Sequence, residues 1–219
     1  MFKPLIQLLA IFAAHNQLET KLDLFIGDDK VGTGIYKESK DHHGNRTSEF
    51  RIYSTRSDGS KIRLINTKVI DSKAFPIMEE EQIDEDLGRK HASTIWKVRY
   101  TDNGTAIFSE TVDKVRYADR IKAPPAGYSR ADSSDLWFTQ TVPLPGTTVT
   151  STSFAIEAKT WQVVETTYIG RKWITVGGRQ IEANEVRDIR DGKVRRVFLD
   201  DKGQPVLMNN GKMRTEKHF

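Results

Sequence analysis

Turn signals recur at short intervals along most of this chain, and they constrain its fold more than any other feature. Many are Asn-Gly or Asp-Gly types, which supply the positive φ angles that tight β-hairpins need. The stretches between them are rich in Val, Ile, Thr and aromatic residues, as strands are. The pattern predicts an antiparallel β-meander of about twelve strands and not a βαβ fold. The signals fall at Gly27-Asp28-Asp29, Gly44-Asn45, Asp58-Gly59, Asp102-Asn103-Gly104, Gly177-Gly178, Asp191-Gly192, Asp201-Lys202-Gly203 and Asn209-Asn210-Gly211.

Alternation inside these stretches indicates which residues share a face of the sheet. The C-terminal half changes phase, because Val164, Thr166 and Tyr168 alternate out of step with Trp161 and Val163. Such a change predicts a β-bulge at that point. We therefore predict an all-β fold: a large curved antiparallel sheet or open half-barrel meander, with two similar lobes as a further option.

Composition divides the chain of 219 residues into four segments. Residues 1–14 carry one positive charge and then about ten mostly apolar residues ending in alanines, which is typical of a signal peptide and too short for a transmembrane helix. The alternative is an amphipathic helix that stays in the protein. We predict β halves at 15–120 and 147–219, joined by a Pro- and Gly-rich linker or lid at 121–146. A signal peptide implies a secreted or periplasmic protein; the alternative location is the cytoplasm.

Charge, cysteine content and missing motifs exclude several functional classes. Lys plus Arg is 34 and Asp plus Glu is 30, a net charge of +4, and the basic residues are scattered. We therefore expect no nucleic-acid partner. Zero cysteine excludes thiol catalysis, Cys-ligated zinc and a cysteine-linked lipid anchor. The chain has no G-x-G-x-x-G, P-loop, G-x-S-x-G or H-E-x-x-H motif, so we predict a non-catalytic protein without cofactor or metal.

A run of acidic residues spans 79–86. Two interpretations are open: a Ca²⁺ site, or a solvated acidic end of a hairpin. The spacing lacks the alternating ligands and central Gly of an EF-hand loop, which favours the hairpin end, and cation binding stays undecided. Its six carboxylates are Glu79, Glu80, Glu81, Asp84, Glu85 and Asp86.

The C-terminal third resembles a known group of proteins. Trp173 to Ala183 forms a hairpin pattern, Asp201-Lys202-Gly203-Gln204-Pro205-Val206 follows, and a charged last strand ends the chain. This order resembles bacterial secreted proteins of unknown function that look similar to the periplasmic lipoprotein-carrier (LolA/LolB-like) half-barrel superfamily. The resemblance covers residues 160–219, and more loosely 20–100. It implies a strongly curved sheet whose concave apolar face shields acyl chains, and it supplies no catalytic residue.

Aromatic residues in or near the strands are the candidate ligand-binding set, with ordinary core packing as the alternative. We predict a non-catalytic extracytoplasmic protein that binds a hydrophobic or lipid-like small molecule, without an integral membrane span. One alternative is a scaffold domain that pairs with an envelope protein. Another is a hydrolase that uses carboxylates such as Glu165 or Glu182 as acid and base. The candidate residues are Trp96, Tyr100, Trp137, Phe138, Trp161 and Trp173.

Overall fold

The computed structural model describes residues 18–73, 75–88, 90–126, 143–156, 158–190, 192–201 and 203–219. Within these residues the chain forms a single sheet of 15 antiparallel strands, which confirms the predicted all-β curved sheet. The strand count exceeds about twelve because β8 and β9 have only two and three residues, too few for an alternation pattern. The strands are β1 (Leu18–Ile26), β2 (Asp29–Lys40), β3 (Arg46–Thr55), β4 (Lys61–Ile70), β5 (Pro76–Asp86), β6 (His91–Tyr100), β7 (Ala106–Val112), β8 (Val115–Arg116), β9 (Arg120–Lys122), β10 (Thr148–Ala155), β11 (Thr160–Val176), β12 (Arg179–Arg190), β13 (Lys193–Leu199), β14 (Pro205–Asn209) and β15 (Met213–Lys217).

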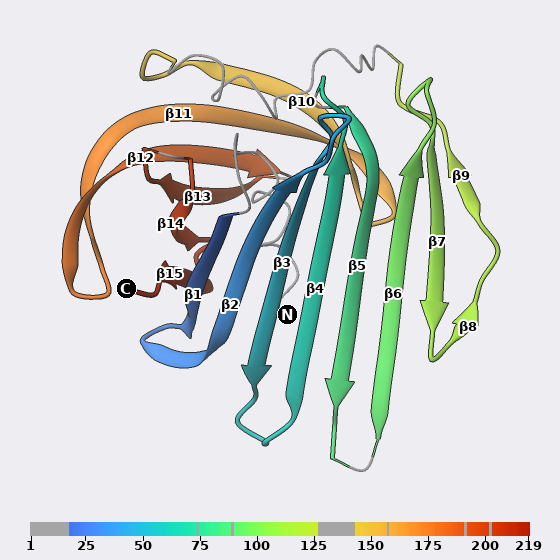
Figure 1. Cartoon of the computed structure of the whole chain (residues 1–219), viewed down its shortest axis with the longest axis horizontal. Helices are drawn as coiled ribbons and strands as arrows, with labels where there is room; N and C mark the ends of the chain where they lie inside the picture. Colours follow the sequence, from blue (N-terminus) through green and yellow to red (C-terminus); the bar gives the residue numbers. More distant parts are fainter. Residues whose placement is uncertain are drawn as a thin grey trace.

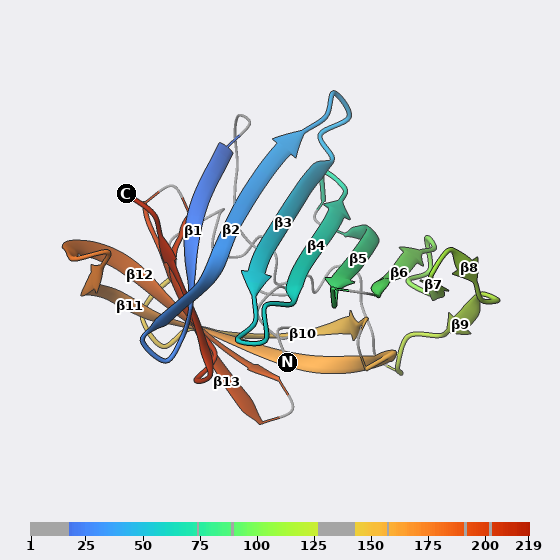
Figure 2. The same cartoon turned by 90° about the horizontal axis from the view of Figure 1, so that it is seen from below.

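The first and last strands of the described chain, β1 and β15, meet in the middle of the sheet. Its order runs β10-β11-β12-β13-β14-β15-β1-β2-β3-β4-β5-β6-β7-β8, with β9 also on β7. The pairing of β15 with β1, in which Leu24 faces Thr215, joins the later strands to the earlier ones (Figure 1). The sheet is open, because β10 and β8 end this order without pairing with each other. Figure 2 shows the sheet curling so that β10 and the start of β11 pass beneath β3–β5.

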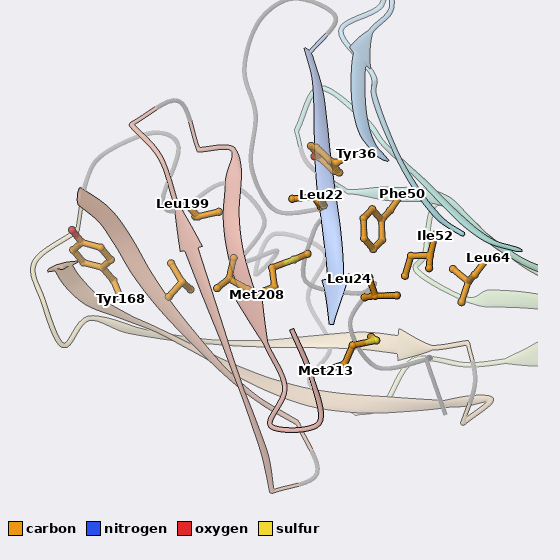
Figure 3. Close-up of a cluster of buried hydrophobic side chains, with 12 residues drawn as sticks. Leu22, Leu24, Tyr36, Phe50, Ile52, Leu64, Tyr168, Leu199, Met208 and Met213 are labelled. Carbon is orange, nitrogen blue, oxygen red and sulfur yellow. The ribbon is translucent and has the colours of Figure 1, made fainter. Parts of the chain in front are cut away.

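The main core lies between the facing sides of the curled sheet. Strands β1–β4 contribute one wall and β11–β15 the other (Figure 3). Alternation explains the pattern, since every second residue of β3 from Phe50 onward is buried. The buried members are Leu22, Leu24, Tyr36, Phe50, Ile52, Leu64, Tyr168, Val186, Val197, Leu199, Met208 and Met213.

A second core forms on the other face of β12–β14. Ala183, Phe198 and Val206 are buried there, and Phe198 stands between two residues of the main core, so it points to the opposite side. The β11–β12 hairpin curls over this face, and the Gly177 amide at its tip donates to Glu216 of β15 at 3.0 Å. The hairpin therefore gives this part of the sheet a small core of its own.

The bulge in β11 lies elsewhere than predicted. Pairing of β11 with β10 runs without a break from Thr160 to Thr167. The register shifts between Tyr168 and Gly170 instead, and Gly170 has a φ of 120°, which favours glycine. The phase change in the sequence therefore does not mark a bulge. It arises because β11 buries opposite faces at Trp161 and at Tyr168, and these contact different clusters.

The acidic run 79–86 forms most of strand β5 and ends at the β5–β6 hairpin turn, so the predicted hairpin end holds for its last residues and fails for Glu79 to Glu81, which lie within the strand. Cross-strand charge pairing explains this, because cations on both sides of β5 reach its carboxylates. Among the described residues no group of three or more His, Cys, Asp or Glu is arranged to hold a metal ion. The pairs are Lys68–Glu79 at 3.8 Å, Lys97–Glu80 at 2.9 Å, Arg63–Asp84 at 3.8 Å and Arg56–Glu85 at 2.9 Å.

Two predicted segments fall wholly or largely outside the described residues. The segment 1–14 is one, and most of 121–146 is the other. Residues 18–122 supply β1–β9, and residues 148–217 supply β10–β15. In the part of the chain that the structure describes, no helix has the length and apolar character needed to cross a membrane.

Candidate ligand-binding site

The two ends of the sheet meet through side chains. Strands β6 and β7 near one end contribute Val98, Ala106 and Phe108, and Phe154 and Ile156 come from the end of β10 and the turn that follows it. All five are buried. Because the sheet order leaves β10 and β7 unpaired, this contact depends on apolar packing and not on a backbone ladder. Three half-buried aromatic residues pack against it: Trp96, Tyr100 and Trp161.

The aromatic rings at this junction are arranged in tilted and edge-on contacts. Trp161 meets Phe154 edge-on, with ring centroids 5.5 Å apart and an interplanar angle of 84°. Tyr100 lies 6.3 Å from Trp161, and Phe108 lies 6.2 Å from Phe154. These separations are typical of favourable aromatic pairs. We call Trp96, Tyr100, Phe108, Phe154 and Trp161 the aromatic seam.

A carboxylate fixes the polar rim of the aromatic seam. Glu110 of β7 accepts a hydrogen bond from the Trp96 indole at 2.7 Å and one from the Lys159 ammonium at 3.0 Å. The bond from Trp96, followed by that from Lys159, holds the pKa of Glu110 below its ordinary value. Lys159 also lies 5.5 Å from the centroid of Phe108, within cation–π range. Lys159 precedes β11 with a φ of 54°, so a strained turn aims its ammonium at the other end of the sheet.

Buried carboxylates continue the concave face beside the aromatic seam. Successive cross-strand pairs from β2 to β6 place one row of residues on the same face of the sheet. The row consists of Glu38, Ser48, Lys68, Glu79 and Val98. Glu81, two residues beyond Glu79, is paired with Trp96. We call Glu38, Glu79 and Glu81 the inner carboxylates. All three are buried, which gives the concave face a polar part next to an aromatic part.

Glu38 is the inner carboxylate with the clearest electrostatic perturbation. Its side chain accepts a hydrogen bond from the Tyr36 hydroxyl at 3.0 Å, and the residue is 8% exposed. Burial raises the pKa of Glu38 to about 7, while the Tyr36 hydrogen bond and the charge of Arg46 oppose the rise. Burial likewise raises the pKa of the Tyr36 phenol. Glu38 therefore changes protonation near neutral pH.

The structure brings together three of the six predicted site residues. Trp96, Tyr100 and Trp161 share the aromatic seam. Trp173 does not, because it is 69% exposed, on the distal half of β11 beyond the bulge. Trp137 and Phe138 lie outside the described residues.

Sequence reasoning missed four contributors to this site: Phe108, Glu110, Phe154 and Lys159. Phe108 and Phe154 stand in alternating stretches, and that signal could have selected them as inward-facing. Glu110 and Lys159 carry no such signal. Their sequence separation is 49 residues, and only the curl of the sheet brings them together.

The two carboxylates named for a hydrolase do not form an acid–base pair. Glu165 of β11 is paired with Ile189, which stands seven residues along β12 from Glu182. At about 3.3 Å per residue the two carboxylates are about 20 Å apart. Glycosidase pairs need about 5 to 10 Å. Both side chains are exposed, so this geometry does not support that chemistry.

A separate groove of about 490 Å³ runs over β2–β6. Most of its lining stands on the face opposite Phe50 and Ile52, and includes Tyr53, Lys61, Arg63, Asp84 and His91. Ser93 donates to Asp84 at 2.8 Å and Arg63 lies 3.8 Å from it, so the carboxylate of Asp84 already has partners within the protein. The mixed charges of this groove do not define one class of polar ligand, whereas the aromatic seam suits an apolar ligand.

The architecture has a counterpart among solved structures. The chain is similar to the crystal structure of a beta-barrel-like protein of domain of unknown function DUF1849 from Brucella abortus, with a TM-score of 0.61. The two sequences are 10% identical, and the match covers 92% of this chain and 95% of the other. The fold is β-barrel-like.

At 10% identity this likeness concerns the fold alone. It supports a β-barrel-like protein of unknown function, and it does not extend to membership of the LolA/LolB-like superfamily. No family model matches the chain, and no curated protein matches it.

Proposed function

We propose that the protein is a non-catalytic carrier that binds a hydrophobic or lipid-like molecule at the aromatic seam. The observation that carries the proposal is the junction of the two sheet ends, which buried apolar side chains close without a backbone ladder and against which half-buried aromatic side chains pack. Among the described residues, separating this junction breaks apolar contacts and the Lys159–Glu110 ion pair but no strand pairing. An apolar ligand that entered there would replace the lost contacts with its own.

The chemistry of the concave face favours an amphipathic molecule. Trp96, Tyr100 and Trp161 offer ring surface to an apolar body. Glu81 is paired with Trp96, and Glu110 accepts from the Trp96 indole, so acceptor oxygens lie beside the same ring. A ligand with an acyl or ring body and a hydroxyl or amide head would use both parts.

We propose an extracytoplasmic location on the basis of residues 1–14, whose charge and apolar run are typical of a signal peptide. The mass of the protein purified from an envelope fraction tests this point. Loss of the first 13 or 14 residues supports export. A full-length chain confined to the cytoplasm contradicts it.

Solvent extraction of the natively purified protein, followed by mass spectrometry, tests the binding proposal directly. We expect a lipid or other amphipathic molecule in the extract, and we expect hydrophobic dyes to shift the tryptophan emission of the stripped protein. An empty extract together with unchanged tryptophan emission contradicts the proposal. A heat-unfolded sample serves as the control, because it lacks the folded junction and should bind no ligand specifically.

A further inference from the structure

Exposed apolar side chains gather at the β8–β9 edge of the sheet. Val115 is 60% exposed, Tyr117 52% and Ile121 73%, within seven residues of one another. Figures 1 and 2 place β8 and β9 at the extreme edge of the sheet, away from the main core. Single exposed apolar residues are ordinary, but a group at an extremity indicates an interaction surface.

Positive charge surrounds these apolar side chains. Lys114, Arg120 and Lys122 are all exposed, and none has an ion pair among the described residues. Arg116, by contrast, pairs with Asp119 at 2.7 Å. The edge thus presents three exposed cations next to aliphatic and aromatic groups, and the charge of one of them, Arg120, also acts on Glu110.

We propose that the β8–β9 edge, comprising Lys114, Val115, Tyr117, Arg120, Ile121 and Lys122, binds an anionic lipid surface. Apolar groups that enter the headgroup region and cations that contact acidic lipids are the two contributions to interfacial binding. The inference rests on the proposed carrier function, because the β8–β9 edge would be the surface at which a carrier exchanges its lipid-like ligand with a membrane.

The position of this edge connects it to the aromatic seam. The Tyr117 amide donates to the carbonyl of Glu110 at 2.9 Å. Arg120 of β9 is paired with Phe108. A membrane bound at the edge would therefore lie next to β7, the strand that supplies Phe108 and Glu110 to the seam and its rim.

The shape of the edge fits a lipid surface better than a protein partner. Val115 is paired with Val112 and Ile121 with Ile107, and these two residues of β7 lie on opposite faces of the strand. The apolar groups therefore project on both sides of the edge, as suits insertion into a headgroup layer. With two and three residues, β8 and β9 offer little backbone for pairing with a partner strand.

Cosedimentation of the full chain with vesicles tests this proposal. The vesicles are an equimolar mixture of phosphatidylcholine and phosphatidylglycerol, or phosphatidylcholine alone. The first variant combines Val115→Ser, Tyr117→Ser and Ile121→Ser, and the second combines Lys114→Gln, Arg120→Gln and Lys122→Gln. The control combines Val163→Ser, Trp173→Ser and Val194→Ser, which removes comparably exposed apolar groups from other strands.

We expect the wild type and the control variant to bind the anionic vesicles at low salt. Neutralising three cations should weaken binding about 100-fold, at roughly fivefold per cation. The Ser variant should lose binding at all salt concentrations. Failure of the wild type to bind anionic vesicles overturns the proposal, as does equal loss in the Ser and control variants. Dye binding by the stripped protein is measured in parallel without vesicles, so a failed edge and a failed ligand site are distinguishable.

Discussion

The Lys159 ammonium lies 3.0 Å from the Glu110 carboxylate and thereby links the two ends of one open sheet. Lys159 immediately precedes β11, and Glu110 belongs to β7, near the opposite end of the strand order. The contact shows where the curled sheet closes on itself. It also identifies the place where that closure depends on side chains alone.

Lys159→Met should weaken the junction measurably. The two side chains are 33% and 21% exposed, so we expect a loss of about 0.5 to 1 kcal/mol in the free energy of unfolding. Because the pKa of Glu110 is lowered, this contribution is present above the ordinary carboxyl pKa and is lost as the pH falls. Urea unfolding at pH 7 and pH 4 measures both effects. The control is Lys37→Met, which breaks the more exposed pair with Glu19 and should lower the free energy of unfolding less. Equal losses in the two variants would contradict a particular contribution of Lys159 to the junction.

Glu38 should make the protein more stable in mild acid than at neutral pH. Its pKa is raised to about 7 in the folded state, so the folded protein binds the proton more tightly than the unfolded chain. The resulting stabilisation is complete below the ordinary carboxyl pKa and is lost as the pH rises through about 7. The loss amounts to about 3 kcal/mol. Glu38→Gln should flatten this part of the stability profile, while the exposed Glu19→Gln should not; an unchanged slope in Glu38→Gln would refute the assignment.

Gly32→Ala should be far more damaging than Gly34→Ala, although both residues lie in β2. A Cβ atom on Gly32 would stand 2.1 Å from the Tyr53 carbonyl oxygen, a backbone atom that cannot yield alone. A Cβ on Gly34 would meet the Phe50 ring at 3.1 Å, and that side chain can shift. We expect a loss of roughly 2 to 4 kcal/mol for Gly32→Ala and about 1 kcal/mol for Gly34→Ala. Thermal unfolding of the two variants measures these losses. A larger loss for Gly34→Ala than for Gly32→Ala would contradict the packing of β2 against β3.

Phe154→Ala should show how much the apolar part of the junction contributes. Phe154 is 1% exposed and contacts both Phe108 and Trp161, so its removal should cost about 3 to 5 kcal/mol. Val163→Ala, at a site 59% exposed on the neighbouring strand, should change stability by no more than about 0.5 kcal/mol. A small effect at Phe154 would mean that the two sheet ends do not depend on each other.

Turn chemistry and alternation predicted much of the fold. Gly177 and Gly178 adopt positive φ angles of 54° and 76°, as the hairpin at that point requires. Trp96 and Tyr100 lie on the same side of β6, as the two-residue period demands. These features are local, so they leave a direct trace in the sequence.

The acidic strand and the closure of the sheet could not be predicted in the same way. The sequence alone predicts a solvated hairpin end for the carboxylates of β5, because the cations that pair with them, such as Lys68 and Lys97, come from other strands. Glu38 appears in sequence as an ordinary solvent-facing acid, although it is buried beside Tyr36. Contacts that depend on how far a sheet curls are not encoded by any period along one strand.

Titration of the stripped protein with a hydrophobic fluorescent probe tests the central claim most directly, using two matched variants. Trp161→Ala removes a ring of the aromatic seam, and Trp173→Ala removes an exposed tryptophan of the same strand. We predict that Trp161→Ala weakens probe binding at least about tenfold and that Trp173→Ala leaves it unchanged. Wild-type affinity in Trp161→Ala, or an equal loss in both variants, would contradict a ligand site at the aromatic seam.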